Sequence, residues 1–341
     1  MSRVTTIDIA NRLGISRGTV SKALNGRNKI DERTRLMVQK AADEMGYKKI
    51  WGDADVELAA SGKTLSIMVQ EQLFGDHYWS VFVKNFGEEA SRKNLKFTVD
   101  VINAEEEANL LFPRSFSIDP PGGIAAIGPI SEDYYRLLQA SKLPVVYVDT
   151  VRSISDADIF GDTLFVCNKE YTNKMTTHLI NKGHKKLGFV SAYFNCRSFN
   201  ERWLGFLDAL EEGDLQVSKK WIFGMNPGEM IEDIRLWIAS LKELPTAFIC
   251  ANDFFAMALK ASLNEAGLDV PKDIALCGFD NDKRLSALYP DLTTADSSAE
   301  YMGKRAMQQL SWRLENPDAP YEVIKITSNV YYRNSTEGYI F

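Results

Sequence analysis

Four neighbouring residues near the N-terminus could contact a nucleic acid: Arg17, Gly18, Ser21 and Lys22. Guanidinium, hydroxyl and ammonium groups donate hydrogen bonds to base edges and phosphates, and Arg17 is suited to a bidentate contact with guanine. Gly18 has no side chain, so it would leave its position unread or let the backbone come close. These groups can act together only if they lie on the first turns of one helix that enters the major groove.

The sequence before these residues predicts a short helix. Thr5 and Asp8 have the spacing of a capping box, with Asp8 in place of the usual Glu or Gln. Three apolar residues then recur on one helical face: Ile7, Ala10 and Leu13.

A second and a third helix are predicted to follow. Gly14 permits a sharp bend, and the Ser16 hydroxyl can cap a helix whose apolar face is Val20, Ala23 and Leu24. Asp31 can cap a further helix that runs to Met45. A small helical bundle without a DNA-binding role could show the same pattern.

The charge distribution favours the DNA-binding interpretation. Residues 1–50 contain 11 Lys or Arg and 5 Asp or Glu, whereas the whole chain contains 40 and 46 and has a net charge of −6. A basic segment on an acidic body is expected when one end of a chain binds phosphates. A merely solvated basic surface explains this reversal of sign less well.

The run from Val4 to Tyr47 resembles the headpiece of the LacI/GalR transcription repressors, most specifically in Thr-Val-Ser-Lys-Ala-Leu-Asn-Gly at 19–26. The resemblance implies that residues 1–50 form a helix-turn-helix headpiece. It also implies base and nearby phosphate contacts for the four residues named first. Backbone-positioning roles are implied for Thr5, Ser16, Thr19, Asn25 and Arg27.

The linker at 51–64 departs from the family pattern. Relatives carry an Asn-Pro-x-Ala-x-Ala-Arg-x-Leu hinge helix that enters the minor groove. This chain lacks the Asn-Pro and the Arg, and it carries Asp53, Asp55 and Glu57 where phosphates would repel them. Either Leu58 still inserts into the groove from a shifted helix, or the hinge does not work in the ordinary way.

From Leu65 onward, apolar strand-like runs alternate with helical segments. The predicted strands are 65–69, 96–102, 123–127, 145–148, 186–190, 247–250 and 274–279. Repeated βαβ units imply an α/β fold in which helices cover both faces of parallel sheets and ligands bind at the carboxyl ends of strands.

The resemblance continues through this region, for example at Arg202 to Phe206, Cys250 to Asp253 and Gly278 to Asn281. The family's regulatory core is similar to the periplasmic sugar-binding proteins. The resemblance therefore implies two doubly wound parallel-sheet lobes in residues 65–341, which are joined by crossovers and close on a small molecule. We expect lobe 1 at about 65–162 plus 295–322, and lobe 2 at about 163–294 plus 323–341.

Candidate effector ligands follow the predicted strands. Asp253 and Asp280 can each accept two hydroxyl hydrogen bonds, as a sugar ring requires, and Arg202 offers donors. The resemblance places these three residues in the cleft between the lobes. Asn252 either helps to bind the effector or caps the following helix, and that capping role is also an alternative for Asp253.

Two further candidates are less specific. Trp79 lies where the family often has Asn-Pro-Phe-Phe, and it could stack on the apolar face of a sugar or belong to the lobe core. Asp149 ends the strand predicted at 145–148. Relatives commonly carry Asp-Asn where this chain has Cys167-Asn168, so one frequent polar contact is expected to be missing.

The sequence offers little for catalysis, and we expect no catalytic residue, cofactor or metal. Ser61-Gly62-Lys63-Thr64 ends like a P-loop but has Glu57 at the required upstream glycine. The histidines His77, His178 and His184 lack metal spacing, and His184 reads as a helix-end residue. The dispersed cysteines Cys167, Cys196, Cys250 and Cys277 are expected to be buried thiols. Without an apolar run of about 20 residues or an export signal, the chain is expected to be cytoplasmic.

These patterns together predict a homodimeric transcription regulator, most simply a repressor of carbohydrate-use genes. Each headpiece would bind one half-site of a pseudo-palindromic double-stranded operator, and a small sugar would control operator affinity allosterically. A purine or a phosphocarrier protein could replace the sugar, because relatives use each. A stand-alone solute-binding protein and a doubly wound enzyme are the competing classes.

Overall fold

The computed structural model describes residues 4, 6–24, 31–45, 64–74, 77–116, 121–191, 195–224 and 231–337. The chain forms two compact units. The first comprises residues 1–64 with 90–96, and the second comprises residues 65–89 with 97–341.

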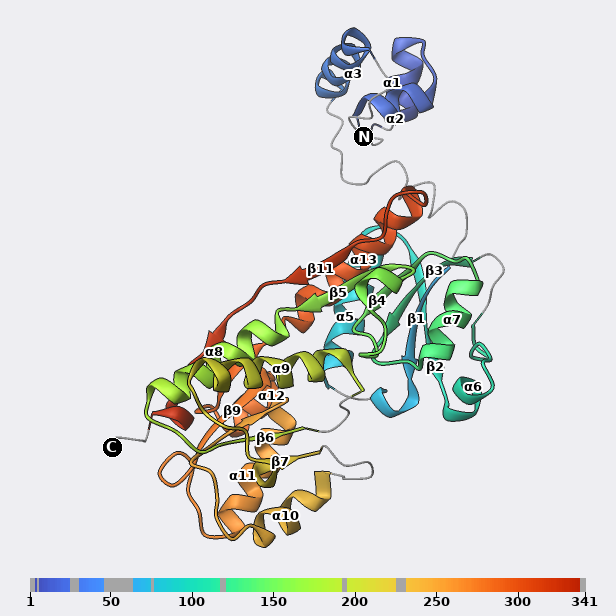
Figure 1. The fold of residues 1–341 in the computed structure, drawn as a ribbon. Helices are drawn as coiled ribbons and strands as arrows, with labels where there is room; N and C mark the ends of the chain where they lie inside the picture. The colour runs from blue at the N-terminus through green and yellow to red at the C-terminus, as the bar shows by residue number, and fades with distance from the viewer. Residues whose placement is uncertain are drawn as a thin grey trace. The chain divides into compact units, whose positions relative to one another are not determined.

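Within the described residues, the N-terminal unit contains the short helices α1 (Thr6–Leu13), α2 (Arg17–Leu24) and α3 (Glu32–Glu44) (Figure 1). Both predicted caps within the described residues form. The Ser16 hydroxyl accepts a hydrogen bond from the Thr19 amide at 3.0 Å, and Asp31 accepts one from the Thr34 amide at 2.9 Å. Gly14 makes the turn between α1 and α2 with a positive φ of 65°, a conformation that costs glycine little.

The core of this three-helix bundle differs from the prediction at one position. Ile7 was expected on the apolar face of α1, but its side chain is 51% exposed and Ile9 is fully buried in its place. Ile9 and Ala10 pack with five small or branched side chains from the other two helices, Val20, Ala23, Val38, Ala41 and Ala42. The buried face of α1 is therefore formed by Ile9 and Ala10, with Leu13 packed against the same core, and it excludes Ile7.

The second unit contains two six-stranded sheets, each of which forms one lobe (Figure 1). The first sheet has the strand order β11-β5-β4-β3-β1-β2, and the pairs β3/β4, β4/β5 and β5/β11 are parallel. Its strands are β1 (Thr64–Gln70), β2 (Lys96–Ile102), β3 (Pro121–Ile127), β4 (Val145–Val148), β5 (Asp162–Val166) and β11 (Val323–Ile326).

The second sheet has the order β12-β10-β9-β8-β6-β7. The four pairs from β7 to β10 are parallel, and the edge strand β12 runs antiparallel to β10. Its strands are β6 (Leu187–Val190), β7 (Ile222–Phe223), β8 (Ala247–Cys250), β9 (Ala275–Asp280), β10 (Thr293–Asp296) and β12 (Val330–Tyr331). Nearly all residues of β4, β5, β6 and β8 are buried, as expected for strands covered on both faces.

Helices surround both sheets. The remaining α-helices are α5 (His77–Arg92), α6 (Ala104–Ala108), α7 (Glu132–Ala140), α8 (Asn168–Asn181), α9 (Arg197–Glu212), α10 (Ile234–Ser240), α11 (Asp253–Glu265), α12 (Lys283–Leu288) and α13 (Ala299–Glu315). Short 3-10 turns occupy Glu71–Leu73, Asp156–Asp158, Lys219–Trp221, Ile231–Asp233 and Asn334–Thr336. α8 and α9 pack so closely that a Cβ added at Gly205 would lie 2.1 Å from the Lys169 carbonyl oxygen.

The chain passes between the two lobes three times, because β5, β10 and β11 are each followed by an element of the other lobe. β5 ends at Val166 and β11 ends at Ile326, both within the first sheet. These two passages come later in the chain than the boundaries expected at 162/163 and 322/323. β5 begins with the charged residue Asp162, and β11 is a four-residue strand without a buried residue, so the sequence showed neither strand clearly.

A buried ion pair joins α13 to the first sheet. Arg313 and Asp162 are almost fully buried, and Nη2 of the guanidinium lies 2.5 Å from Oδ1 of the carboxylate. The guanidinium also donates to the carbonyl oxygens of Ala319 and Pro320 at 2.6 and 2.9 Å. Because the guanidinium and the carboxylate are buried and bonded to groups of the same lobe, this pair is not a candidate ligand site, and removing one partner would leave a buried charge unpaired.

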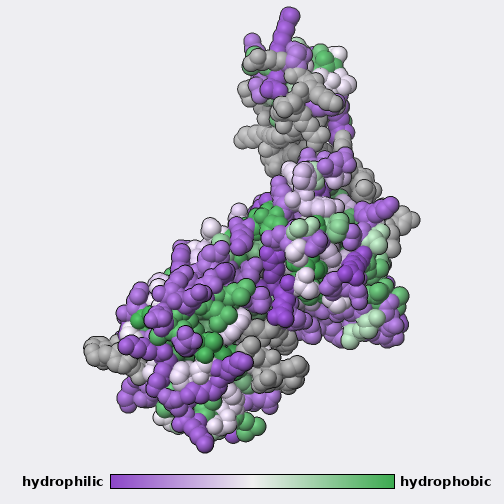
Figure 2. All heavy atoms as spheres, in the orientation of Figure 1, coloured by the Kyte–Doolittle hydropathy of each residue, from purple (hydrophilic) through white to green (hydrophobic). Residues whose placement is uncertain are grey.

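The surface of the core is mixed in polarity. Figure 2 shows hydrophobic side chains among hydrophilic ones on the visible face, with a gathering over the second lobe near α9, where Leu204 is exposed. No helix in the described residues is both long and apolar enough to cross a membrane.

Candidate functional site

The outer side of α2 carries the predicted DNA-contacting residues that the structure describes. Val20 and Ala23 turn into the bundle core, so Gly18 and Lys22 lie on the exposed side and Arg17 is partly exposed. The Thr19 hydroxyl lies 2.9 Å from the Ser16 hydroxyl and helps to fix the start of the helix. The helix that carries the exposed groups is therefore held in place by its buried side and by the contact at its first turn. A helix that binds in the major groove needs such support.

Five predicted DNA contacts cannot be placed. Thr5, Asn25, Arg27 and Leu58 lie outside the described residues, and so does the side chain of Ser21. The linker from 51 to 63 lies outside them as well.

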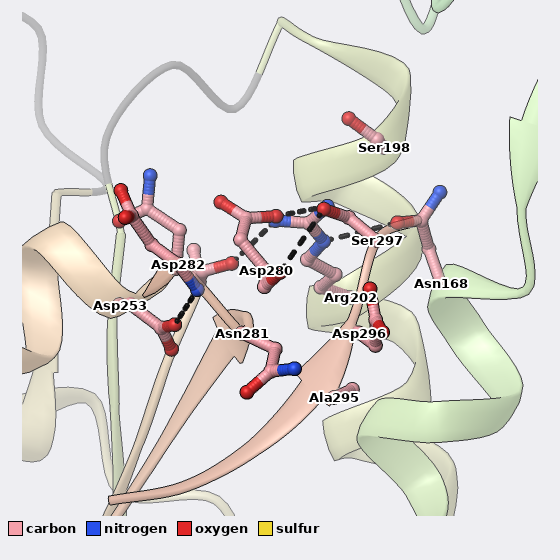
Figure 3. A network of polar contacts seen from close by, with 12 residues as sticks. Asn168, Ser198, Arg202, Asp253, Asp280, Asn281, Asp282, Ala295, Asp296 and Ser297 are labelled. Atoms are coloured by element: carbon pink, nitrogen blue, oxygen red, sulfur yellow. Dashed lines mark hydrogen bonds and ion pairs between the residues drawn. The ribbon is translucent and has the colours of Figure 1, made fainter. Parts of the chain in front are cut away.

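The second cluster of predicted residues centres on Arg202 of α9, whose side chain is only 6% exposed. Its guanidinium stacks on the Phe279 ring at 3.7 Å from the ring centroid. Nε donates to Asn168 Oδ1 at 3.0 Å, Nη1 donates to the Ala251 carbonyl oxygen at 2.6 Å, and Nη2 lies 3.6 Å from Asp280 Oδ1 (Figure 3). Arg202 is thus fixed against the carboxyl ends of β8 and β9, and Asp280 is its anionic partner.

Asp280 begins a strained loop at the end of β9. Asp280 and the following Asn281 both have positive φ angles, 108° and 51°. Such conformations cost a non-glycine residue about 1 kcal/mol or more and tend to persist where surrounding contacts enforce them. The Ser297 hydroxyl, beyond the end of β10, lies 3.4 Å from the Asp280 carbonyl oxygen (Figure 3).

Asn252 and Asp253 have different partners inside the second lobe, and the N-cap of α11 is Asn252 rather than Asp253. Asn252 caps α11 by accepting a hydrogen bond from the Phe255 amide at 2.9 Å, which is the capping alternative. Asp253 is 1% exposed, and its two oxygens accept hydrogen bonds from Thr294 Oγ1 at 2.6 Å and from the Asp282 amide at 2.8 Å. Both oxygens of the Asp253 carboxyl group are therefore engaged by groups of the second lobe itself.

Asp149 joins the two lobes. It follows β4 of the first lobe, and its carboxylate accepts hydrogen bonds from the amide and hydroxyl of Ser198 and from the Cys196 thiol, at the start of α9 in the second lobe. Val151 and Cys196 also form an isolated antiparallel bridge. Burial, followed by the nearby Asp149, raises the pKa of the Cys196 thiol, so this thiol stays protonated and acts as a donor.

Trp79 lies in the first turn of α5 in the first lobe. Its ring packs edge-on against Tyr78 and Phe82, with centroid distances of 4.7 and 6.0 Å. Two residues earlier, His77 Nε2 lies 3.5 Å from Asp282 Oδ1 at the end of β9 in the second lobe. The first turn of α5 therefore faces the loop that carries Asp280.

Sequence reasoning missed three participants in this cluster. Asn168 retains a polar contact with Arg202 although the preceding Asp of the family pattern is replaced by Cys167. His77 and Asp282 form a second contact between the lobes, besides that of Asp149 with the start of α9. Asn168 could have been proposed from its position just after a buried strand. Its contact with Arg202 could not, because the two residues are 34 positions apart in the chain.

Metal binding finds no support in the described part of the chain. There, no group of His, Cys, Asp or Glu is arranged to hold a metal ion. The four cysteines are free, and Cys196, Cys250 and Cys277 are buried.

A helix-turn-helix bundle followed by two parallel α/β lobes, with polar groups at the carboxyl ends of the strands, defines a DNA-binding protein with a small-molecule-binding core. A family profile described as bacterial regulatory proteins, lacI family, matches residues 5–49, and a periplasmic binding protein-like domain profile matches residues 176–336. The chain therefore combines a lacI-family DNA-binding domain with a periplasmic binding protein-like domain.

Individual relatives are similar over almost the full length. The HTH-type transcriptional repressor PurR of Mannheimia succiniciproducens is 26% identical over 339 residues, which cover 98% of both chains. The solved structure of a transcriptional regulator CelR–cellobiose complex shares 19% identity with a TM-score of 0.68 and covers 98% of this chain and 100% of that one. The lac repressor dimer bound to operator and the anti-inducer ONPF shares 20% identity with a TM-score of 0.67, over 98% and 99% of the chains.

Proposed function

We propose that the chain is a homodimeric repressor of carbohydrate-use genes that acts in the cytoplasm, where it binds a pseudo-palindromic operator and responds to a small sugar. Two headpieces would each place α2 in the major groove, with Arg17 contacting bases. The effector would bind between the lobes, against Arg202 and Asp280, with Trp79 and Asp149 on the side of the first lobe.

The observation that carries this proposal is the fixed Arg202–Asp280 pair. The guanidinium is oriented by Asn168, Ala251 and Phe279, so little freedom remains to be lost when a ligand binds. Asp280 is partly exposed and can accept hydroxyl hydrogen bonds, which suits a polyhydroxylated ligand. The description of the CelR structure as a cellobiose complex supports a sugar, because that core shares this fold.

The test is fluorescence anisotropy of the full-length protein on DNA from upstream of its own gene, over a salt series and with a panel of sugars and purine bases. We expect tight, salt-sensitive binding that one sugar alters, because phosphate contacts release counterions and an effector must bind two states unequally. A response to a purine and to no sugar would overturn the sugar assignment. Binding no tighter than to random DNA would overturn operator recognition.

The Asp280→Ala variant tests the site itself. We expect operator affinity within about twofold of wild type and loss of the effector response, because Asp280 is remote in sequence from the headpiece and one charged hydrogen-bonding partner is worth roughly 1.5–3 kcal/mol. Lys325→Ala, on an exposed edge strand of the same core, is the control. A normal effector response in Asp280→Ala would contradict the assignment.

We also propose that the acidic linker does not act as an ordinary minor-groove helix. The carboxylates of Asp53, Asp55 and Glu57 would be repelled by phosphates. Leu58→Ala is then expected to keep specific operator binding in the same titration. Abolition of specific binding by Leu58→Ala with the dimer intact would show instead that Leu58 inserts into the groove.

A further inference from the structure

The strained loop at 280–282 is held by side chains from two other elements. Thr294 of β10 accepts a hydrogen bond from the Asn281 amide at 3.2 Å, and Asp253 of α11 accepts one from the Asp282 amide at 2.8 Å. Two successive amides of a left-handed turn thus have side-chain acceptors, and Thr294 Oγ1 lies 2.6 Å from Asp253 Oδ1. Figure 3 shows Asp253 beneath this loop, on the side away from Arg202.

The space for Asp253 depends on a glycine. Gly278 of β9 lies directly opposite Thr294 of β10 in the parallel register. A Cβ at Gly278 would lie 2.2 Å from Asp253 Oδ1, closer than any real contact. The Asp253 carboxyl group therefore occupies space that any side chain at position 278 would take, so glycine is required there.

The loop in turn carries two groups that face different partners. Asp280 faces Arg202 within the second lobe, and Asp282 lies against His77 of the first lobe at 3.5 Å. A change in the backbone at 281–282 would move both carboxylates together.

We propose that Asp253 is a positioning residue that, with Thr294, holds the 280–282 loop so that Asp280 presents its carboxylate to Arg202 and Asp282 meets His77. The role rests on the proposed effector site, because Asp280 is the ligand that is positioned. Asp253 acts through the loop and does not touch the effector.

The environment of Asp253 links this role to pH. Burial, and then the neighbouring Asp280, raise the pKa of Asp253 to about 8. Asp282 in the loop also raises this pKa, and the Cys250 thiol on β8 lies close enough to Asp253 that its own pKa, raised mainly by burial, is raised by Asp253 as well. The cation Arg202 is bonded to the Ala251 carbonyl oxygen and faces Asp280. Protonated Asp253 can donate to Thr294 Oγ1, whose own hydroxyl hydrogen can then turn to the Ala295 carbonyl oxygen at 3.3 Å.

The sign of the pH effect follows from linkage. In an open loop the carboxyl regains water and its pKa falls toward the ordinary value near 4, whereas in the closed loop it is about 8. Loss of the proton therefore favours the open loop. Opening should increase as pH rises from about 4 to 8 and should level off above 8.

Hydrogen–deuterium exchange of the peptide covering 279–284 in the full-length protein tests this without an effector, with mass-spectrometric detection and rates corrected for intrinsic exchange. We expect Asp253→Ala to speed exchange there by roughly tenfold, since a buried hydrogen bond is lost. Asp253→Asn has the shape of the protonated form, so its exchange should be no faster than that of wild type. The ratio of wild-type to Asp253→Asn rates should rise toward pH 8, by at most about tenfold per pH unit, and then become constant.

Asp100→Asn is the matched control, because Asp100 is an equally buried carboxylate in the other lobe that accepts hydrogen bonds from Ser66, Thr98 and Ser115. It should leave exchange at 279–284 unchanged. Unchanged exchange in Asp253→Ala, or a pH-independent ratio of wild type to Asp253→Asn, would overturn the proposal. Failure of the sugar panel would overturn the proposed effector and would leave this result standing, so the two failures are distinguishable.

Discussion

Asp253 and Asp280 both come at the end of a buried strand, yet their carboxylates reach different partners. β8 and β9 are neighbours, so the sequence placed both residues correctly at one edge of the sheet. The difference arises because Gly278 leaves space for the Asp253 carboxyl group and Thr294 forms a hydrogen bond with it. These two residues lie 25 and 41 positions after Asp253 in the chain. A local pattern can predict which edge a residue occupies, but long-range packing decides whether its side chain faces solvent.

Arg17 offers a residue-scale test of sequence reading by α2. Arg17→Ala should reduce operator binding by about 1–3 kcal/mol while binding to random DNA falls much less, because a bidentate base contact discriminates and a phosphate contact does not. Anisotropy titrations on both DNAs at one salt concentration measure this. Lys40→Ala, an exposed residue on α3, is the control, and equal losses on the two DNAs would refute a base contact by Arg17.

At the scale of elements, apolar strands were predictable, even those of four residues such as β4 and β8, whereas polar strands and the two-residue strands were not. Each of the seven predicted strands corresponds to a strand of the structure within two residues at either end. The strands that the sequence did not predict include β10, which reads Thr-Thr-Ala-Asp, and β12, which has two residues. β5 starts with Asp162, and its burial depends on Arg313, which is 151 residues away. The position of such strands depends on packing against the rest of the sheet, so their own residues predict them poorly.

The packing of α8 against α9 gives a prediction for an element. Gly205→Ala would place a methyl group against the Lys169 carbonyl oxygen, and backbone cannot give way as a flexible side chain can. We expect a loss of about 1–3 kcal/mol in the free energy of unfolding, as is typical of overpacking. Urea denaturation measures this, with Leu204→Ala on the exposed side of the same helix as control. A loss no larger than that of Leu204→Ala would show that the two helices can separate at little cost.

At the scale of the whole molecule, the proposed dimer needs an apolar surface on the core. Phe254 on α11 and Leu288 on α12 are 58% and 76% exposed, and these helices are neighbours in the second lobe. Large exposed apolar side chains on neighbouring helices are candidates for an interaction surface. We therefore expect these two residues to contribute to the contact between protomers.

Leu288→Asp should dissociate the dimer, because a charge would be buried without a partner. Light scattering after size exclusion should then report a mass near that of one 38.4 kDa chain, and operator binding should weaken because two half-sites are no longer bound together. Leu236→Asp on α10, at a side chain that is also exposed, is the control and should remain dimeric. A dimer that survives Leu288→Asp would place the interface elsewhere.

The three passages of the chain between the lobes also set an order of assembly during synthesis. The first sheet receives β11 and the second receives β12 only when residues 323–331 have left the ribosome, whereas α1 to α3 are complete after 44 residues. The DNA-reading bundle is therefore available for most of the time that translation takes, before either lobe can close its sheet. A nascent or prematurely terminated chain would therefore carry the complete DNA-binding bundle without a complete sensor core, so removal of such chains would remove DNA-binding domains that no effector controls.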